Sequence, residues 1–153
     1  MKRRLAREIA VQSLYQLEMN EVTGDEAINI LMEEARQDNE IGTEVKELPV
    51  IDTYTRELVS GVKENQEAID QKLVGYLTGW NVDRLSRVDR QILRLATYEL
   101  LFCPDVPSKV VINEAIELAK HFGLEENGKF VNGVLGRMVR EHEQLGLQGE
   151  KPE

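Results

Sequence analysis

Four basic side chains lie within the first seven residues and could bind an anion: Lys2, Arg3, Arg4 and Arg7. They oppose the dipole of a helix that begins here, because a helix N-terminus favours acidic residues by about 0.3–1 kcal/mol each. Arg3 and Arg7 are four residues apart and share a helical face, which suits phosphate neutralisation and stacking of guanidinium groups on unpaired bases. The alternative interpretation is a basic terminus that is merely solvated.

A second group that could bind RNA is Lys129–Phe130, which follows Asn127 and Gly128 near the start of a predicted helix. A lysine beside an aromatic ring can hold a phosphate while the ring stacks on a base. The alternative interpretation buries Phe130 in the core.

Four arginines recur along a helix predicted over about residues 82–103. At 100° per residue they fall within about 120° of one another, away from the apolar stripe, and form a basic stripe of Arg84, Arg87, Arg90 and Arg94. A solvated helix face is the alternative. Asp89 lies at the edge of the apolar face of the same helix, where an acidic group can orient a partner or form an intramolecular ion pair.

Metal and nucleophile chemistry find little support. Glu114, Glu117 and His121 share helical spacing, but a carboxylate-bridged centre needs Glu-x-x-His on two helices, and neither His121 nor His142 follows a glutamate by three residues. Cys103 has no nucleophile motif around it. Glycine-rich phosphate loops and Gly-x-Ser-x-Gly are absent from the sequence. We expect no metal, no cofactor and no catalytic residue.

The charge of the 153-residue chain is uneven. The net charge is −9, yet residues 1–7 sum to +4, 8–74 to −11, 75–94 to +2, 95–128 to −4 and 129–153 to zero. A uniformly acidic surface repels a phosphate backbone. A basic end on an acidic body instead predicts a localised anion-binding site.

Length and hydropathy predict one compact cytoplasmic unit. The longest stretch without a charged residue is Leu73–Val82, ten positions, whereas a membrane-spanning helix needs roughly 20. The basic start resembles that of a secretory signal, but Arg7 and Glu8 interrupt the place of its apolar segment.

Apolar residues recur three and four apart almost everywhere, so the predicted fold class is all-α. About seven helices are expected, over residues 3–20 and 25–38, from Pro49 through Val62, and over 66–76, 82–103, 107–122 and 126–145, with residues 146–153 as a frayed tail. Asn65 is a plausible cap of the fourth helix. The β-branched run Val110–Ile112 favours a strand locally, but the sequence after it favours a helix.

Three segments together resemble the NusB family of transcription antitermination factors. The first is Arg3–Tyr15, the second is Val88–Leu100, and the third is Val106–Lys120 with its continuation Lys129–Leu135. They occur in matching order and spacing over roughly residues 3–137, which makes the resemblance more specific than any single motif.

The resemblance implies an all-helical domain over 1–145, made of two small helical bundles packed at an angle, about 1–64 and 65–145. It also implies no enzyme activity and a role in bacterial ribosomal RNA transcription. The expected partners are single-stranded boxA-type RNA, the small-subunit ribosomal protein NusE and the RNA polymerase antitermination complex.

The resemblance also assigns roles to residues. Arg3, Arg4 and Arg7, with Lys2 beside them, match the arginine-rich RNA-binding start of the family, and Lys129 and Phe130 match its second RNA contact. Asp89 matches an acidic position that faces NusE. Positions at which the family is functionally sensitive correspond to Tyr15 and Glu126. Leu5 stands where some members have an arginine, so no RNA contact is assigned to it.

Two other functions compete with an RNA-binding adaptor. One is a helical protein–protein interaction module without direct RNA contact. The other is the NusB-like accessory domain of ribosomal RNA methyltransferases, which requires a long additional domain for S-adenosylmethionine that this sequence does not contain. We favour the RNA-binding adaptor, with the interaction module second.

Overall fold

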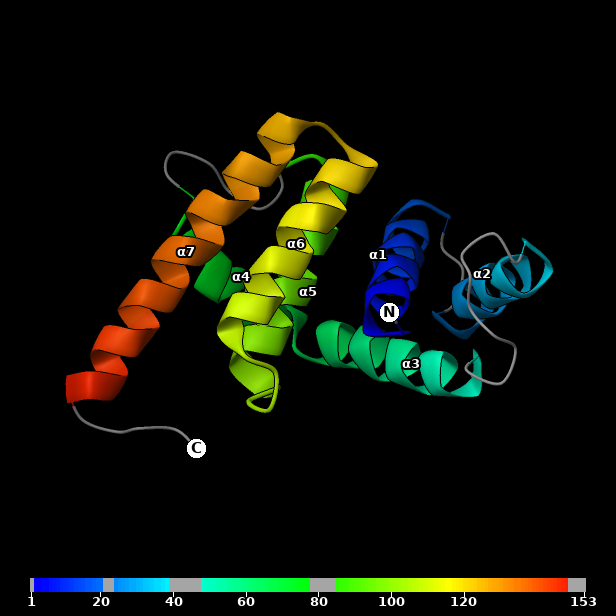
Figure 1. Ribbon diagram of the computed structural model, residues 1–153, viewed down its shortest axis with the longest axis horizontal. Helices are drawn as coiled ribbons and strands as arrows, with labels where there is room; N and C mark the ends of the chain where they lie inside the picture. The colour runs from blue at the N-terminus through cyan, green and yellow to red at the C-terminus, as the bar shows by residue number, and fades with distance from the viewer. Residues whose placement is uncertain (1, 21–23, 39–47, 78–84, 149–153) are drawn as a thin grey trace. The chain divides into compact units, whose positions relative to one another are not determined.

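The computed structural model describes residues 2–20, 24–38, 48–77 and 85–148, without the side chains of 2, 20, 24, 25, 34–38, 48 and 142–148. These residues form helices and no strand (Figure 1). The helices are α1 (Lys2–Asn20), α2 (Gly24–Asp38), α3 (Leu48–Glu64), α4 (Gln66–Val74), α5 (Arg87–Phe102), α6 (Ser108–Phe122) and α7 (Glu125–Gln148). The all-α prediction is confirmed, and no helix among the described residues is long and apolar enough to cross a membrane.

The chain divides into two compact units, Met1–Glu64 and Asn65–Glu153. In the first unit α1 packs on both α2 and α3. The buried residues of α1 include Ala6, Ala10 and Leu14, which recur every four residues along one face. The Thr55 hydroxyl donates to the Ala6 carbonyl at 3.4 Å and joins α3 to α1.

In the second unit α6 and α7 run side by side, and α5 packs against α4, α6 and α7 (Figure 1). Val111 is buried within α6, so the helical interpretation of the β-branched run is correct. Burial against neighbouring helices outweighs the small intrinsic preference of valine and isoleucine for strands.

The starts of α4 and α5 differ from the prediction. Asn65 precedes α4 but its side chain makes no capping hydrogen bond. Helix α5 begins at Arg87, later than expected, because Ser86 is its N-cap and its hydroxyl accepts the backbone N–H of Asp89 at 3.2 Å. A serine three residues before an acidic residue is a sequence signal for a helix start.

The expected basic stripe on α5 is wrong for two of its arginines. Arg90 and Arg94 are buried, and Arg84 lies outside the described residues. Arg90 donates to the carbonyl of Leu85 at 3.1 Å. Of the four, only Arg87 is exposed among the described residues. The residues from Asp89 to Thr97 are all buried, so the angular position of an arginine on this helix does not tell whether it is exposed.

Arg94 is held by a two-point ion pair to α4. Its Nε and Nη2 donate to the two carboxylate oxygens of Asp70, each at 2.9 Å. Bidentate geometry and partial burial make such a pair stronger than an exposed one.

We therefore expect Arg94→Ala to lower the free energy of unfolding by about 2–3 kcal/mol, because the partly buried Asp70 carboxylate loses its partner. Arg87→Ala on the same helix is the matched control and should change it by less than about 0.5 kcal/mol. Urea denaturation of both variants measures the difference. Equal effects would contradict the structural role of the ion pair.

Tyr76 joins the exit of α4 to α7. Its hydroxyl donates to Oε1 of Glu141 at 2.8 Å, and the guanidinium carbon of Arg137 lies 5.6 Å from the ring centroid. Burial raises the pKa of Tyr76 above its ordinary value of 10.0, and the hydrogen bond and charge of Glu141 raise it further, while the charge of Arg137 opposes them.

Because the folded-state pKa of Tyr76 exceeds the unfolded one, its contribution to stability is complete below the unfolded pKa and is lost as pH rises through the folded pKa. The difference in free energy of unfolding between the parent and Tyr76→Phe should therefore shrink as the pH rises from neutral to above 10.0, the ordinary pKa of tyrosine. Denaturant titrations across this range measure it. A difference that stays constant with pH contradicts the assignment.

Candidate nucleic-acid interface

The arginine-rich start of α1 divides into an exposed and a buried part. Arg3 and Arg4 are exposed, and the side chain of Lys2 lies outside the described residues. Arg7 is only 3% exposed and already has an interaction partner within the chain. Its spacing explains this, since Ala10, Val11 and Leu14 follow at three, four and seven residues and are all buried. The expectation that Arg7 stands at an exposed helix end is therefore wrong.

Arg3 lies over an aromatic ring. Its guanidinium carbon is 5.3 Å from the ring centroid of Tyr54 on α3, a cation–π arrangement. The Tyr54 side chain is half-buried. No local sequence signal could have found this pair, because Arg3 and Tyr54 lie on two different helices that come together only when the bundle packs.

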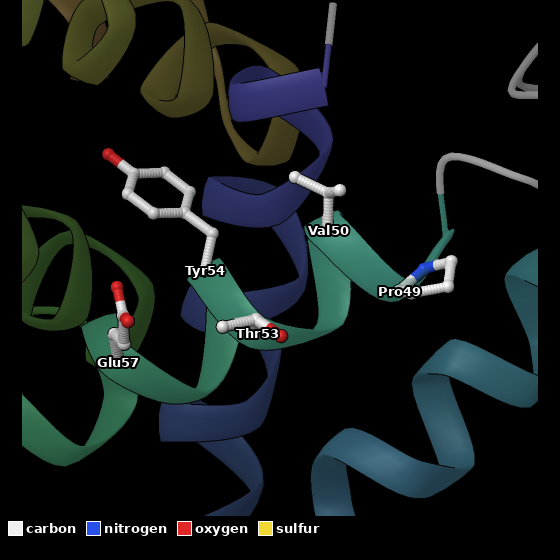
Figure 2. A pocket seen from close by; sticks show the side chains of 5 residues that line it. All are labelled: Pro49, Val50, Thr53, Tyr54 and Glu57. Carbon is white, nitrogen blue, oxygen red and sulfur yellow. The ribbon is translucent and has the colours of Figure 1, made fainter.

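Tyr54 lines a shallow groove of about 450 Å³ on α3. Figure 2 shows its lining side chains, Pro49, Val50, Thr53, Tyr54 and Glu57. Val50 and the Tyr54 ring project from the same side of the helix (Figure 2), and Val50 is exposed. The groove thus gives the arginine-rich start an adjoining surface on which a flat, partly apolar group such as a nucleobase can lie.

Lys129 and Phe130 lie in the first turns of α7. Lys129 is exposed and Phe130 is 37% exposed, whereas the following Val131 is fully buried. Val131, not Phe130, supplies the core contact of this turn. The alternative that buries Phe130 in the core is wrong, and its ring is accessible for stacking.

Asp89, the expected partner contact, is the third residue of α5 and is 8% exposed. Its two carboxylate oxygens accept hydrogen bonds from Nδ2 of Asn127, at 3.2 and 3.0 Å. Among the described residues the hydrogen-bond partner of the Asp89 carboxylate is therefore a neutral amide. The intramolecular ion pair that was the alternative interpretation of Asp89 is not seen there.

Asn127 also organises the start of α7. The Oδ1 atom of Asn127 accepts a hydrogen bond from the backbone N–H of Leu124 at 2.8 Å, and the backbone N–H of Asn127 donates to the Leu124 carbonyl at 3.0 Å. The side chain of Asn127, the third residue of α7, thus accepts the backbone N–H of the residue just before the helix, which is one of the two hydrogen bonds of a capping box. Sequence analysis did not assign this role to Asn127, because an asparagine inside the first turn carries no strong local signal.

The remaining predicted positions are less informative. Tyr15 is half-buried on α1, and Glu126 is exposed at the start of α7. Cys103 is a half-buried free thiol. In the part of the chain that the structure describes, no group of three or more His, Cys, Asp or Glu could hold a metal ion.

Comparison with known proteins places this fold and these residues in one family. The NusB family model matches residues 4–140. The transcription antitermination protein NusB of Clostridium botulinum (strain Kyoto / Type A2) is 43% identical over 145 residues, covering 91% of this chain and 100% of the relative.

Solved structures agree. That of T. maritima NusB is similar with a TM-score of 0.75 at 38% identity, covering 91% of each chain. A crystal structure of antitermination factors NusB and NusE in complex with dsRNA has a TM-score of 0.73 at 28% identity and covers 92% of this chain and 97% of that chain. Since the family model spans most of the chain and the relative is matched over its whole length, the chain belongs to the NusB family.

Proposed function

We propose that this protein is an RNA-binding adaptor in bacterial transcription antitermination. It binds boxA-type RNA of nascent ribosomal RNA transcripts together with the ribosomal protein NusE and joins the RNA polymerase antitermination complex. It acts in the cytoplasm and catalyses no reaction.

The observation that carries this proposal is a pair of exposed cation–aromatic sites on a NusB fold. Arg3 lies over the ring of Tyr54 in the first unit, with the exposed Arg4 next to it in the sequence, and Lys129 precedes Phe130 in the second unit. A solved NusB binds RNA together with NusE on a similar fold. The interaction module without RNA contact is the weaker alternative, because a solved NusB–NusE complex on a similar fold contains RNA.

Single-stranded RNA fits these sites better than a duplex. An unpaired base offers both of its faces to Phe130 or to the ring of Tyr54, whereas bases in an A-form duplex are stacked on one another and their deep major groove is closed to side chains. The RNA in the solved NusB–NusE complex is double-stranded, so both forms belong in the test.

The NusE-like partner should tighten RNA binding by about 5–150-fold, the usual range of coupling between sites. The reason is electrostatic: the acidic body of the chain limits how many phosphates it can neutralise alone, and a basic partner extends the positive surface. The test titrates labelled boxA-type RNA, single-stranded and duplex, into the chain with and without saturating partner. Equal dissociation constants with and without partner contradict the proposal, as does equal binding of a scrambled sequence.

Arg3→Ala and Arg4→Ala should weaken RNA binding and change the free energy of unfolding by no more than about 1 kcal/mol, because both side chains are exposed and an exposed cation–π contact such as that of Arg3 with Tyr54 contributes about 0.5–1 kcal/mol. Each lost phosphate contact makes the slope of the logarithm of the binding constant against the logarithm of the salt concentration less steep by about 0.7 for single-stranded RNA. Arg7→Ala should instead lower the free energy of unfolding by about 1–3 kcal/mol, because a buried guanidinium loses its interactions.

Lys63→Ala, an exposed cation in the last turn of α3, is the charge-matched control for the arginine variants. Salt titrations of RNA binding and thermal melts on all four variants separate the arginines that contact RNA, Arg3 and Arg4, from the structural Arg7. An unchanged salt slope for Arg3→Ala and Arg4→Ala removes both from the RNA site.

Phe130→Leu should keep the fold and weaken RNA binding, because base stacking on an aromatic ring contributes about 1–3 kcal/mol. Phe102→Leu is the matched control, since Phe102 is 44% exposed and stacks on Tyr98 of its own helix. Affinity and melting temperature are measured on both variants. A lowered melting temperature with parental RNA affinity for Phe130→Leu would return this ring to a structural role.

A further inference from the structure

We propose that Asn127 is a positioning residue that couples partner binding at Asp89 to RNA binding at the start of α7. This inference rests on the proposed function, because it takes Asp89 as the partner contact and Lys129 with Phe130 as an RNA contact. It adds the physical route by which one binding event favours the other.

The route is a single planar amide with a different contact at each end. Nδ2 of Asn127 holds the Asp89 carboxylate of α5, and Oδ1 holds the N–H of Leu124, which directly precedes α7. Because the amide is planar, the direction of one end fixes the direction of the other. A change in how the carboxylate is held is therefore transmitted to the first turn of α7.

The position of this amide is fixed by close packing. A β-carbon on Gly123 would lie 2.7 Å from Oδ1 and 2.8 Å from Cγ of Asn127, so the glycine leaves the amide enough room and little more. The backbone N–H of Asn127 is also bound, to the Leu124 carbonyl. The amide has few alternative orientations that keep its contacts, which is what a coupling element requires.

Asp89 is suited to receive a group from outside the chain. Buried charges are normally paired with opposite charges, yet the described hydrogen bonds to this carboxylate all come from the neutral Asn127 amide. Each carboxylate oxygen has a second lone pair that the amide does not occupy. A basic side chain of the partner can therefore bind Asp89 without displacing Asn127.

Both binding events then depend on the orientation of the same few residues. A partner cation on Asp89 holds the carboxylate, and through it the Asn127 amide and the Leu124 N–H, in one arrangement, and RNA on Lys129 and Phe130 contacts the turn that this arrangement sets. Whichever ligand binds first favours the arrangement that the second one needs, so the second binds more tightly. By linkage the effect is equal in both directions.

The sharpest variant is Asn127→Asp. The introduced carboxylate still accepts the Leu124 N–H and still suits a helix N-terminus, but it repels Asp89 in place of donating to it. Asn132→Asp is the matched control, because Asn132 is an exposed residue of the same helix and the change adds the same charge.

The coupling factor is the RNA dissociation constant of the chain alone divided by that with saturating NusE-like partner. We expect Asn127→Asp to reduce this factor by about fivefold or more, while Asn132→Asp keeps the parental factor. RNA affinity without partner should be equal in the two variants within about twofold, since both keep the helix start and add one charge. Circular dichroism melts establish that both are folded.

A second measurement follows the transmission directly. In the 15N-labelled parent and in Asn132→Asp, adding partner without RNA should slow hydrogen exchange at the Leu124 amide. In Asn127→Asp the same addition should leave that exchange unchanged. A purely structural role of Asn127 predicts no such dependence on the partner.

The double variant Asp89→Asn/Asn127→Asp exchanges donor and acceptor across the same contact. It restores the link between α5 and α7 and moves the negative charge to α7. The coupling factor should return toward the parental value although more partner is needed for saturation. Rescue of coupling without rescue of partner affinity separates the link from the charge that the partner recognises.

The outcomes separate a failure of the proposed function from a failure of the coupling role of Asn127. A parental coupling factor of one contradicts the proposed function and with it this inference. A large parental factor that Asn127→Asp leaves intact overturns the inference alone. A double variant that stays as uncoupled as Asn127→Asp also overturns it.

Discussion

The turn from α6 into α7 depends on two places where the chain has no space for a β-carbon. At Gly123 such an atom would meet the Asn127 side chain, and at Gly128 it would lie 2.9 Å from Cγ of Lys120 and 3.3 Å from Cγ2 of Ile116. These close approaches set how α7 leaves the turn and packs along α6. The accessible positions of Lys129 and Phe130 follow from that path, as does the reach of Asn127 to Asp89.

Helical periodicity predicted most of the fold, because the buried stripes are regular where helices pack along their length. It placed α1, α2 and α6 within one residue of their observed bounds. It failed at the start of α5, where one hydrogen bond from Ser86 decides the boundary and the hydrophobic pattern continues upstream through Leu85, which is itself buried. Helix ends depend on single caps, whereas helix bodies depend on many repeated contacts.

The residue types of the candidate site could be predicted from the sequence, but the burial of each side chain could not. Spacing placed Arg3 and Arg7 on one face, yet burial increases over the first two turns of α1, so Arg3 is exposed and Arg7 is not. The same limit applies to Arg94, whose partner Asp70 lies 24 positions away. Tyr54 and Asn127 acquire their roles only when two helices meet, and no local pattern records such a meeting.

Glu125 and Glu126, which begin α7 and are exposed beside Lys129, have a consequence for a cell crowded with other RNA. Acidic residues stabilise the start of this helix through its dipole, but they repel every phosphate backbone that approaches, whatever its sequence. RNA held by charge alone gains little there and leaves quickly. Stacking of an unpaired base on the ring of Phe130 would offset this repulsion for a single strand of any sequence, whereas a duplex has no free base face to offer, so the two glutamates would disfavour duplex RNA more than single strands.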